Sequence, residues 1–271
     1  MMYFRSGKIL YFSFTIVSLA IILCTTFWVP TFRITLILLE YIVLFGTDLL
    51  IALSYNKRFN RLVLSYQEHC DPELFLEQMD SCLRQSRAWY RFYRVALIHR
   101  GSGLAACGRF EEAILDLTTI DLEKLTRPRY AAHLGSILNC LAKAYLWEGD
   151  DESADQALHD LEGLSQNTEV HPNVRQVLQK NTVTRRYEWG LLTGSAQGAE
   201  DYFSAMLQIS TCTLERVTYT FYLGWAQLLS GKKEEAARNL QAVAKGAPKL
   251  FIAQRAREML AQCRSPVSGD G

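Results

Sequence analysis

One stretch of this sequence decides its fold: residues 223–236, LGWAQLLSGKKEEA. An apolar segment ends at Gly231, a polar segment follows, and Ala236 stands five residues after the glycine. The glycine lets a helix end in a left-handed cap and reverse, and the alanine lets the returning helix lie close against the first. The stretch therefore predicts a helical hairpin.

The same glycine–alanine spacing occurs four times between residues 108 and 236. The pairs are Gly108/Ala113, Gly149/Ala154, Gly194/Ala199 and Gly231/Ala236, and their glycines are 41, 45 and 37 residues apart. Helical hairpins that repeat at such intervals stack on their neighbours and bury a shared core. We therefore expect stacked helical hairpins, an architecture that usually binds other proteins.

The rest of the chain after residue 57 also favours helices, because apolar residues recur every three or four positions and strand patterns are weak. Asp71-Pro72-Glu73 combines an N-cap residue, a proline at the first helical position and an early acid. Pro128, Pro172 and Pro248 indicate later helix starts. We predict an all-α chain of about ten helices after residue 57, joined by short turns.

Over residues 88–263 the sequence resembles the tetratricopeptide repeat family, in the form of a membrane-anchored bacterial-type member. The fourth unit carries the resemblance best, with Leu223-Gly224, Gly231, Ala236, Leu240 and Pro248 at family positions. The first two units follow the same register. The third departs from it, with Tyr187 where the family has a small residue and Gly190 where it has an aromatic one. Because the family repeat is about 34 residues, the longer spacing here implies lengthened helices or loops.

The resemblance implies a concave groove lined by the first helix of each hairpin. By register, the groove residues are Ile98, Ser102 and Ala105, Asn139, Lys143 and Leu146, Thr184, Glu188 and Leu191, and Phe221, Trp225 and Leu228. Asn139 and Lys143, one turn apart, are suited to grip a peptide backbone or a carboxylate. The full basic clamp of the chaperone-binding members is absent, and Phe221 and Trp225 fit a core as well as a groove.

Two apolar stretches precede the repeats. Residues 9–29 contain no charge, and residues 34–55 contain only Glu40 and Asp48. Each is long enough to cross a hydrocarbon core of about 30 Å, and residues 30–33 between them suffice for a tight turn. We predict a two-helix transmembrane hairpin. A cleaved signal peptide is the alternative for the first stretch, but no small-residue cleavage pattern follows it.

The two acids weaken the second predicted span, because a central acid costs about 2.5–3.5 kcal/mol on insertion scales. Glu40 and Asp48 either contact another membrane protein or form a proton site, or they are protonated acids bonded to hydroxyls of the first span. Basic residues flank the outer ends of the hairpin: Arg5, Lys8, Lys57, Arg58 and Arg61. The positive-inside rule then predicts a multi-pass cell-membrane protein with both termini in the cytoplasm.

These patterns divide the chain into a membrane hairpin at 1–56, a helical-repeat domain at 57–264 and a disordered tail at 265–271. Residues 58–86 and 248–263 are expected to cap the two ends of the array, with Arg255, Arg257 and Glu258 exposed. Seven cysteines without a CxxC pair indicate reduced, mostly buried thiols rather than a zinc site or a disulfide framework.

No motif in the sequence indicates catalysis, a cofactor or a metal site, and the five histidines are scattered. A formal charge of +1 argues against nucleic-acid binding. Arginines 84, 87, 91 and 94 would share one face if residues 81–100 formed a single helix. Such a face suits anionic lipid headgroups or an acidic peptide, and equally an ordinary solvated surface.

The leading hypothesis is a membrane-tethered adaptor, not an enzyme, that recruits a protein partner through the groove. The alternative is an accessory subunit of a membrane complex, which contacts the complex through the hairpin with Glu40 and Asp48. The two hypotheses differ in whether the groove or the hairpin binds the partner.

Overall fold

A computed structural model describes Ile16, residues 30–86 and residues 90–264, apart from the side chains of residues 30–40, 44, 48, 51, 90, 91 and 264. These residues form the α-helices α2 (Pro30–His69), α3 (Pro72–Ser86), α4 (Tyr90–Ala106), α5 (Phe110–Thr118), α6 (Ala131–Glu148), α7 (Asp151–Gln166), α8 (Pro172–Leu192), α9 (Ala199–Gln208), α10 (Thr213–Leu229), α11 (Lys233–Gly246) and α12 (Phe251–Arg264). Two short 3-10 helices, η1 (Glu123–Leu125) and η2 (Pro128–Tyr130), precede α6. No strand occurs in the described residues, which confirms the all-α prediction.

Helix α2 is longer than the predicted second span. It begins at Pro30, so residues 30–33 form its first turn instead of the expected tight turn, and it continues past residue 56 to His69. Proline is favoured in the first turn of a helix because its missing N–H would have no intrahelical partner there. In the part of the chain that the structure describes, no helix is both long enough and apolar enough to cross a membrane.

Other expectations for the N-terminal region fall on residues that are not described. The predicted span 9–29, apart from Ile16, and the predicted tail 265–271 lie outside the described residues. Glu40 and Asp48 are helical positions of α2, but their side chains also lie outside them. The chain divides into two compact units, residues 1–64 and residues 65–271.

The start of the second unit follows the predicted signals. Asp71 caps α3, its Oδ1 accepting a hydrogen bond of 3.2 Å from the Leu74 N–H, and the helix begins at Pro72 as predicted. Helices α3 and α4 pack side by side, so residues 81–86 and 90–100 do not belong to the single helix that the arginine face required. Arg94 is buried, with its guanidinium 5.1 Å from the centre of the Tyr130 ring.

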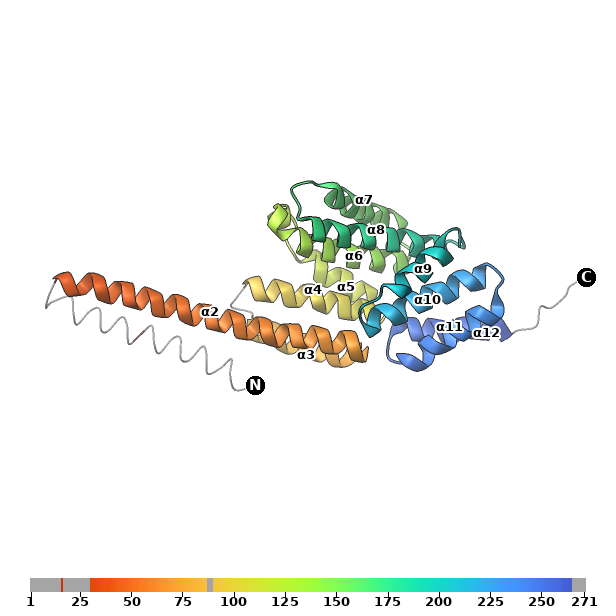
Figure 1. Cartoon of the computed structure of the whole chain (residues 1–271), viewed down its shortest axis with the longest axis horizontal. Helices are drawn as coiled ribbons and strands as arrows, with labels where there is room; N and C mark the ends of the chain where they lie inside the picture. The colour runs from red at the N-terminus through yellow and green to blue at the C-terminus, as the bar shows by residue number, and fades with distance from the viewer. Residues whose placement is uncertain (1–15, 17–29, 87–89, 265–271) are drawn as a thin grey trace, which may run out of the picture. The chain divides into compact units, whose positions relative to one another are not determined.

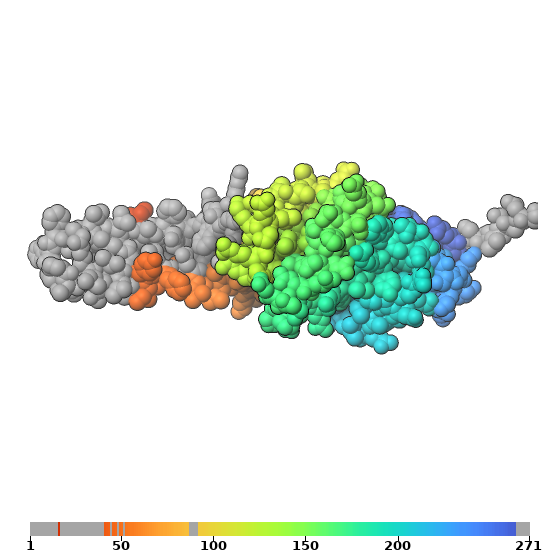
Figure 2. All heavy atoms as spheres, turned by 90° about the horizontal axis from the view of Figure 1, so that it is seen from above, coloured from red at the N-terminus to blue at the C-terminus, as the bar shows by residue number. Residues whose placement is uncertain are grey.

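The helices of the second unit form two layers of an array (Figure 1). Helices α4, α6, α8 and α10 contact one another in that order and make the inner layer, while α5, α7 and α11 each pack on the inner helix that precedes them. Figure 2 shows α6 to α9, coloured from yellow-green to cyan, as one continuous face of this unit. Each inner helix therefore shares its core with the next, as in a repeat stack.

The four predicted turns have the expected backbone geometry. Their glycines have left-handed φ angles of +79°, +77°, +86° and +78° at Gly108, Gly149, Gly194 and Gly231. The paired alanines have no exposed surface: Ala113, Ala154, Ala199 and Ala236. A methyl side chain is thus buried wherever an outer helix returns from its turn.

The third repeat differs from the other three. Tyr187, which occupies the small-residue position of α8, stacks on Tyr202 of α9 with ring centroids 4.7 Å apart. A bulky ring at that position prevents close approach of the two backbones, and α9 packs mainly against α10. Like α5 and α7, α9 contacts the inner helix that follows it, but it lacks the extensive contact that they make with the inner helix that precedes them.

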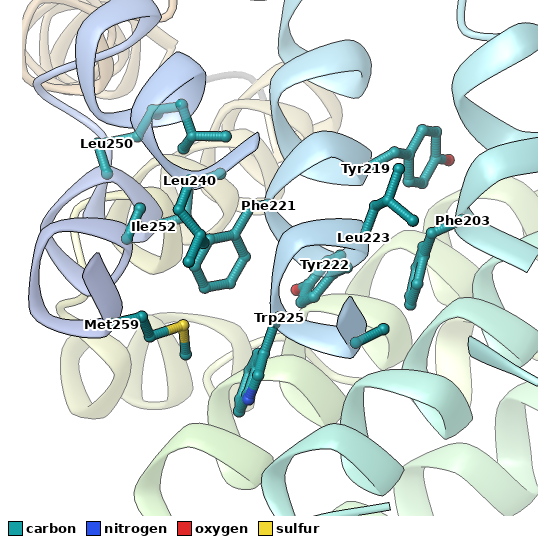
Figure 3. Close-up of a cluster of buried hydrophobic side chains, with 14 of the residues drawn as sticks. Phe203, Tyr219, Phe221, Tyr222, Leu223, Trp225, Leu240, Leu250, Ile252 and Met259 are labelled. Atoms are coloured by element: carbon teal, nitrogen blue, oxygen red, sulfur yellow. The ribbon is translucent and has the colours of Figure 1, made fainter. Parts of the chain in front are cut away.

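Helix α10 lies at the centre of an extensive core cluster, the main one among the described residues (Figure 3). Phe203 of α9 stacks on Tyr222 of α10 with centroids 5.0 Å apart, while Phe221 points to the other side of α10, toward Leu240 and Ile252. Residues 221–227 are all buried, so this helix is enclosed on every face over two turns. Side chains on opposite faces of α10 thereby join the third repeat to α11 and α12.

The two ends of the repeat array meet. Lys249 Nζ donates a hydrogen bond of 2.5 Å to Asp71 Oδ2, and Phe251 packs edge-on against Phe110 with centroids 5.1 Å apart. The start of α12 therefore lies against the first hairpin and does not form an open end. Arg255, expected to be exposed, is partly buried, with its guanidinium 5.7 Å from the centre of the Trp147 ring.

Candidate binding pocket

A pocket of about 330 Å³ opens where the inner helices converge on the start of α12. Its lining comes from six segments: the end of α2, the inner helices α4, α6, α8 and α10, and residues 250–252. The lining residues are Tyr66, Ile98, His99, Ser102, Ala105, Ala106, Ser136, Asn139, Cys140, Lys143, Lys180, Asn181, Thr184, Arg185, Leu214, Glu215, Thr218, Tyr219, Leu250, Phe251 and Ile252. Segments up to about 190 residues apart in the sequence thus build a single concavity.

Half of the groove residues assigned by repeat register lie in this pocket. They come from the first three repeats: Ile98, Ser102, Ala105, Asn139, Lys143 and Thr184. Ser102 is exposed at the pocket, whereas Ile98 and Ala105 are buried. The structure therefore brings together candidates from α4, α6 and α8.

The other register residues do not line the pocket. Glu188 and Phe221 have no exposed surface, and Trp225 is 7% exposed. Leu146 and Leu191 are buried as well, and Leu228 packs against the main core cluster. These side chains belong to the C-terminal halves of α6, α8 and α10, where each helix is covered by its neighbours.

On α8 and α10 the pocket residues missed by the register follow a simple helical pattern. On α8 they are Lys180, Asn181 and Arg185, and on α10 they are Leu214, Glu215, Thr218 and Tyr219. Both sets recur at intervals of one and of three to five residues, which is one face of a helix. The amphipathic N-terminal half of α10, in contrast to the apolar run at 221–226, was the sequence signal for this face. Helices α4 and α6 add His99, Ala106, Ser136 and Cys140.

A buried carboxylate organises the polar wall of the pocket. Glu188 Oε1 accepts a hydrogen bond of 2.7 Å from Trp147 Nε1 and another from the Tyr222 hydroxyl, and Glu188 Oε2 accepts one from Arg185. Burial opposes the charge on Arg185, but the Glu188 carboxylate more than offsets it, so the pKa of the guanidinium is raised. Glu188 therefore joins α6, α8 and α10 behind the pocket, and its charge is compensated there.

Lys143 stands beside this network without a carboxylate of its own. In the described part of the chain its Nζ makes neither an ion pair nor a hydrogen bond. Burial lowers the pKa of this ammonium, and the charge of Glu188 only partly counteracts that effect. One turn earlier on α6, the buried Oδ1 of Asn139 has no hydrogen-bond partner among the described residues. Two adjacent polar side chains thus line the pocket without a structural partner.

The remaining polar groups of the pocket are paired or neutral. Lys180 donates a 2.8 Å hydrogen bond to Glu215 across α8 and α10. Burial, assisted by nearby His133, lowers the pKa of His99 to about 4, so this imidazole is neutral at pH 7. Burial also raises the pKa of the Cys140 thiol to about 11, which keeps it protonated and unreactive.

The start of α12 supplies the apolar part of the lining, through Leu250, Phe251 and Ile252. Phe251 also packs edge-on against Trp147, with ring centroids 4.9 Å apart, and Trp147 is the side chain that donates to Glu188. The polar network and the closure between α12 and the first hairpin therefore share one aromatic side chain.

Comparisons of the chain with protein-family models, with curated proteins and with solved structures found no match.

Proposed function

We propose that this protein is a membrane-tethered adaptor that binds a protein partner through the pocket of its helical array. The observation that supports the proposal is the convergence of register residues from three successive repeats, Ile98, Asn139 and Thr184 among them, on one concave site. The inner helices of a repeat stack expose such a surface because their outer faces are covered by the second helices. The similarity to tetratricopeptide repeats, with four left-handed turn glycines and buried alanines, belongs to the same proposal.

The tether is supported by the surface of α2. Large apolar side chains are exposed around this helix, with exposed fractions of 74% for Tyr41, 67% for Phe45 and 66% for Leu50. Water-exposed apolar side chains on several faces of one helix indicate contact with lipid or with another protein. We propose that α2, together with the apolar stretch 9–29, holds the array at the cytoplasmic side of the cell membrane.

The pocket is tested by filling it. Ser102 is exposed at the pocket, so Ser102→Trp narrows the site with little effect on the core, and Gln241→Trp on the exposed face of α11 is the matched control. Full-length wild-type protein and both variants are purified from cells, and the proteins that accompany them are quantified by mass spectrometry. The expected result is a partner that is retained by Gln241→Trp and lost from Ser102→Trp. Equal retention of the partner by both variants would contradict the proposal that the partner binds in the pocket.

The tether is tested by introducing charge. Because the stretch 9–29 is part of the proposed tether, the substitutions Phe45→Asp and Leu50→Asp are combined with Leu19→Asp in that stretch. The full-length triple variant should be released from membranes in a flotation assay, because each aspartate opposes transfer into lipid by about 2.5–3.5 kcal/mol. Leu115, on α5, is also 67% exposed, and Leu115→Asp should leave flotation unchanged. The accessory-subunit alternative predicts a different pattern, in which the partner survives Ser102→Trp and is lost with the α2 substitutions.

A further inference from the structure

The charges in the pocket do not balance. The lining holds three cationic side chains, Lys143, Lys180 and Arg185. Lys180 is paired with Glu215, and Arg185 is paired with Glu188 behind the wall. Lys143 has no ion pair within the described residues, and the nearby Glu188 carboxylate is already paired with Arg185, which leaves one positive charge in excess. A partly buried ammonium is costly to keep unless something binds to it.

Asn139, close to Lys143 on α6, also lacks a side-chain partner within the described residues. Asn139 lies one helical turn away, lines the same pocket and makes no side-chain hydrogen bond among the described residues. The Lys143 ammonium and the Nδ2 amide of Asn139 can both donate to a single anionic group, whereas the buried Oδ1 of Asn139 can only accept a hydrogen bond. Buried polar groups of native proteins are normally satisfied, so the unsatisfied Asn139 Oδ1, beside an ammonium that has no ion pair among the described residues, indicates a binding role.

The rest of the lining limits what else the ligand contains. Residues 250–252, Ile98 and Leu214 are apolar and face the same cavity. The volume of about 330 Å³ is at the lower end of the range of about 300–1,000 Å³ for small-molecule sites. The closure of the array between Lys249 and Asp71 also places α12 against the first hairpin, so the pocket is bounded at that side.

We infer that the pocket binds a carboxylate group that carries a short apolar chain, with the carboxylate at Lys143 and Asn139 and the apolar chain against residues 250–252. The single unbalanced charge favours a monoanion over a phosphate dianion. The inference shares only the pocket with the proposed function and does not require a protein partner. The carboxylate has two possible sources, a free small acid or the C-terminal residue of a protein partner, and the test separates them.

The test uses the full-length protein and isothermal titration calorimetry with 4-methylpentanoate as the probe. The neutral amide of the same shape, 4-methylpentanamide, should bind at least about tenfold more weakly, because a charge-assisted hydrogen bond contributes a factor of this order. Inorganic phosphate should not compete. Lys143→Met should reduce probe affinity at least about tenfold, while Lys245→Met removes an exposed charge on α11 and should change it less than twofold.

N-acetyl-leucine, compared with 4-methylpentanoate, identifies the source of the carboxylate, and its C-terminal amide is the neutral control. Tighter binding of N-acetyl-leucine than of 4-methylpentanoate assigns the pocket to a chain end, and the reverse order assigns it to a free acid. Either order supports the inference. Equal binding of acid and amide, competition by phosphate, or unchanged affinity in Lys143→Met would overturn it, as would failure of both acids to bind. If Lys143→Met unfolds, Lys143→Gln replaces it.

The two proposals fail separately. Loss of the partner from Ser102→Trp without any binding of the two acids would remove only the carboxylate inference. If an acid binds but the Ser102→Trp variant retains the partner, only the proposal that the partner binds in the pocket is rejected.

Discussion

The first and fourth repeat turns have nearly the same backbone geometry and very different surroundings. Gly108 and Gly231 have φ angles of +79° and +78°. In both turns the residue after the glycine donates back to the helix, over 2.9 Å from Arg109 N to Leu104 O and over 2.9 Å from Lys232 N to Gln227 O. This is the closing hydrogen bond of a glycine-capped helix.

The difference lies in what faces each glycine. A Cβ added at Gly108 would lie 2.4 Å from the Phe251 ring, whereas a Cβ at Gly231 would meet nothing within 4 Å. Local sequence therefore explains Gly231 completely, because its requirement is only conformational. Gly108 has a second requirement, imposed by a residue of α12 that also lines the pocket.

The largest expected effect is that of Gly108→Ala. A left-handed alanine costs about 1–2 kcal/mol, and overpacking against Phe251 adds about 1–3 kcal/mol, so we expect a loss of about 3 kcal/mol in the free energy of unfolding. Urea unfolding followed by circular dichroism measures it. Gly163→Ala, at an exposed position of α7 without a close neighbour, is the control and should be neutral or stabilising. Similar losses in both variants would refute the role of Phe251.

A double-mutant cycle with Phe251→Ala isolates the contact itself. Without the ring, Gly108→Ala should cost only its conformational strain, so the coupling energy between the two sites should be about 2 kcal/mol. The four proteins are compared by urea unfolding under identical conditions. Strictly additive losses would show that the Cβ at position 108 does not meet Phe251.

Gly231→Ala should lower the free energy of unfolding by a smaller amount, about 1–2 kcal/mol, because the only cost is that of an alanine in the left-handed conformation. Hydrogen exchange should increase first in α10 and α11, because repeats couple mainly to their neighbours. Affinity for the carboxylate probe should be unchanged, whereas Gly108→Ala, which displaces Phe251 from the lining, should weaken it. Equal effects of the two variants on the probe would contradict this distinction.

The smallest loss in the free energy of unfolding is expected for Asp71→Asn, which removes the ion pair with Lys249 between the two ends of the array. The hydrogen bond from Lys249 holds the pKa of the Asp71 carboxyl below its usual value. A lowered folded-state pKa contributes stability above the unfolded pKa of about 3.9, and this contribution is lost as the pH falls through the lower value.

The pair is exposed at Lys249, so the loss should be smaller than that of Gly231→Ala and should shrink further in 1 M NaCl. Unfolding midpoints of wild type and Asp71→Asn are compared at pH 7 and at successively lower pH, and the difference should shrink as the Asp71 carboxyl becomes protonated. A difference that persists at low pH would indicate that Asp71 acts through its cap on α3.

The sequence predicted the pocket on α4 and α6 better than on α8 and α10. The resemblance to tetratricopeptide repeats implied, by register along each helix, that Ile98, Ser102, Asn139 and Lys143 line a groove, and these residues line the pocket. The same register selected Phe221 and Trp225 on α10, which are core residues, because α11 and α12 cover the C-terminal half of that helix. Repeat register finds the face of a helix, but it does not find how much of that face its neighbours cover.

By itself the sequence determined that residues 72–264 form helices joined by left-handed turns, because helix periodicity, proline starts at 72 and 172 and glycine caps act within a few residues of the chain. The predicted helix start at Pro248 was wrong, since this proline lies in the turn before α12, and Pro128 begins the 3-10 helix η2 instead of α6. Only the tertiary structure decided that the array closes on itself. The Lys249–Asp71 pair spans 178 residues, and the position of Phe251 against Gly108 depends on the summed rotation of every hairpin between them. No local pattern encodes such a sum, and for that reason the pocket, with its one unbalanced lysine, emerges only when all the helices are in place.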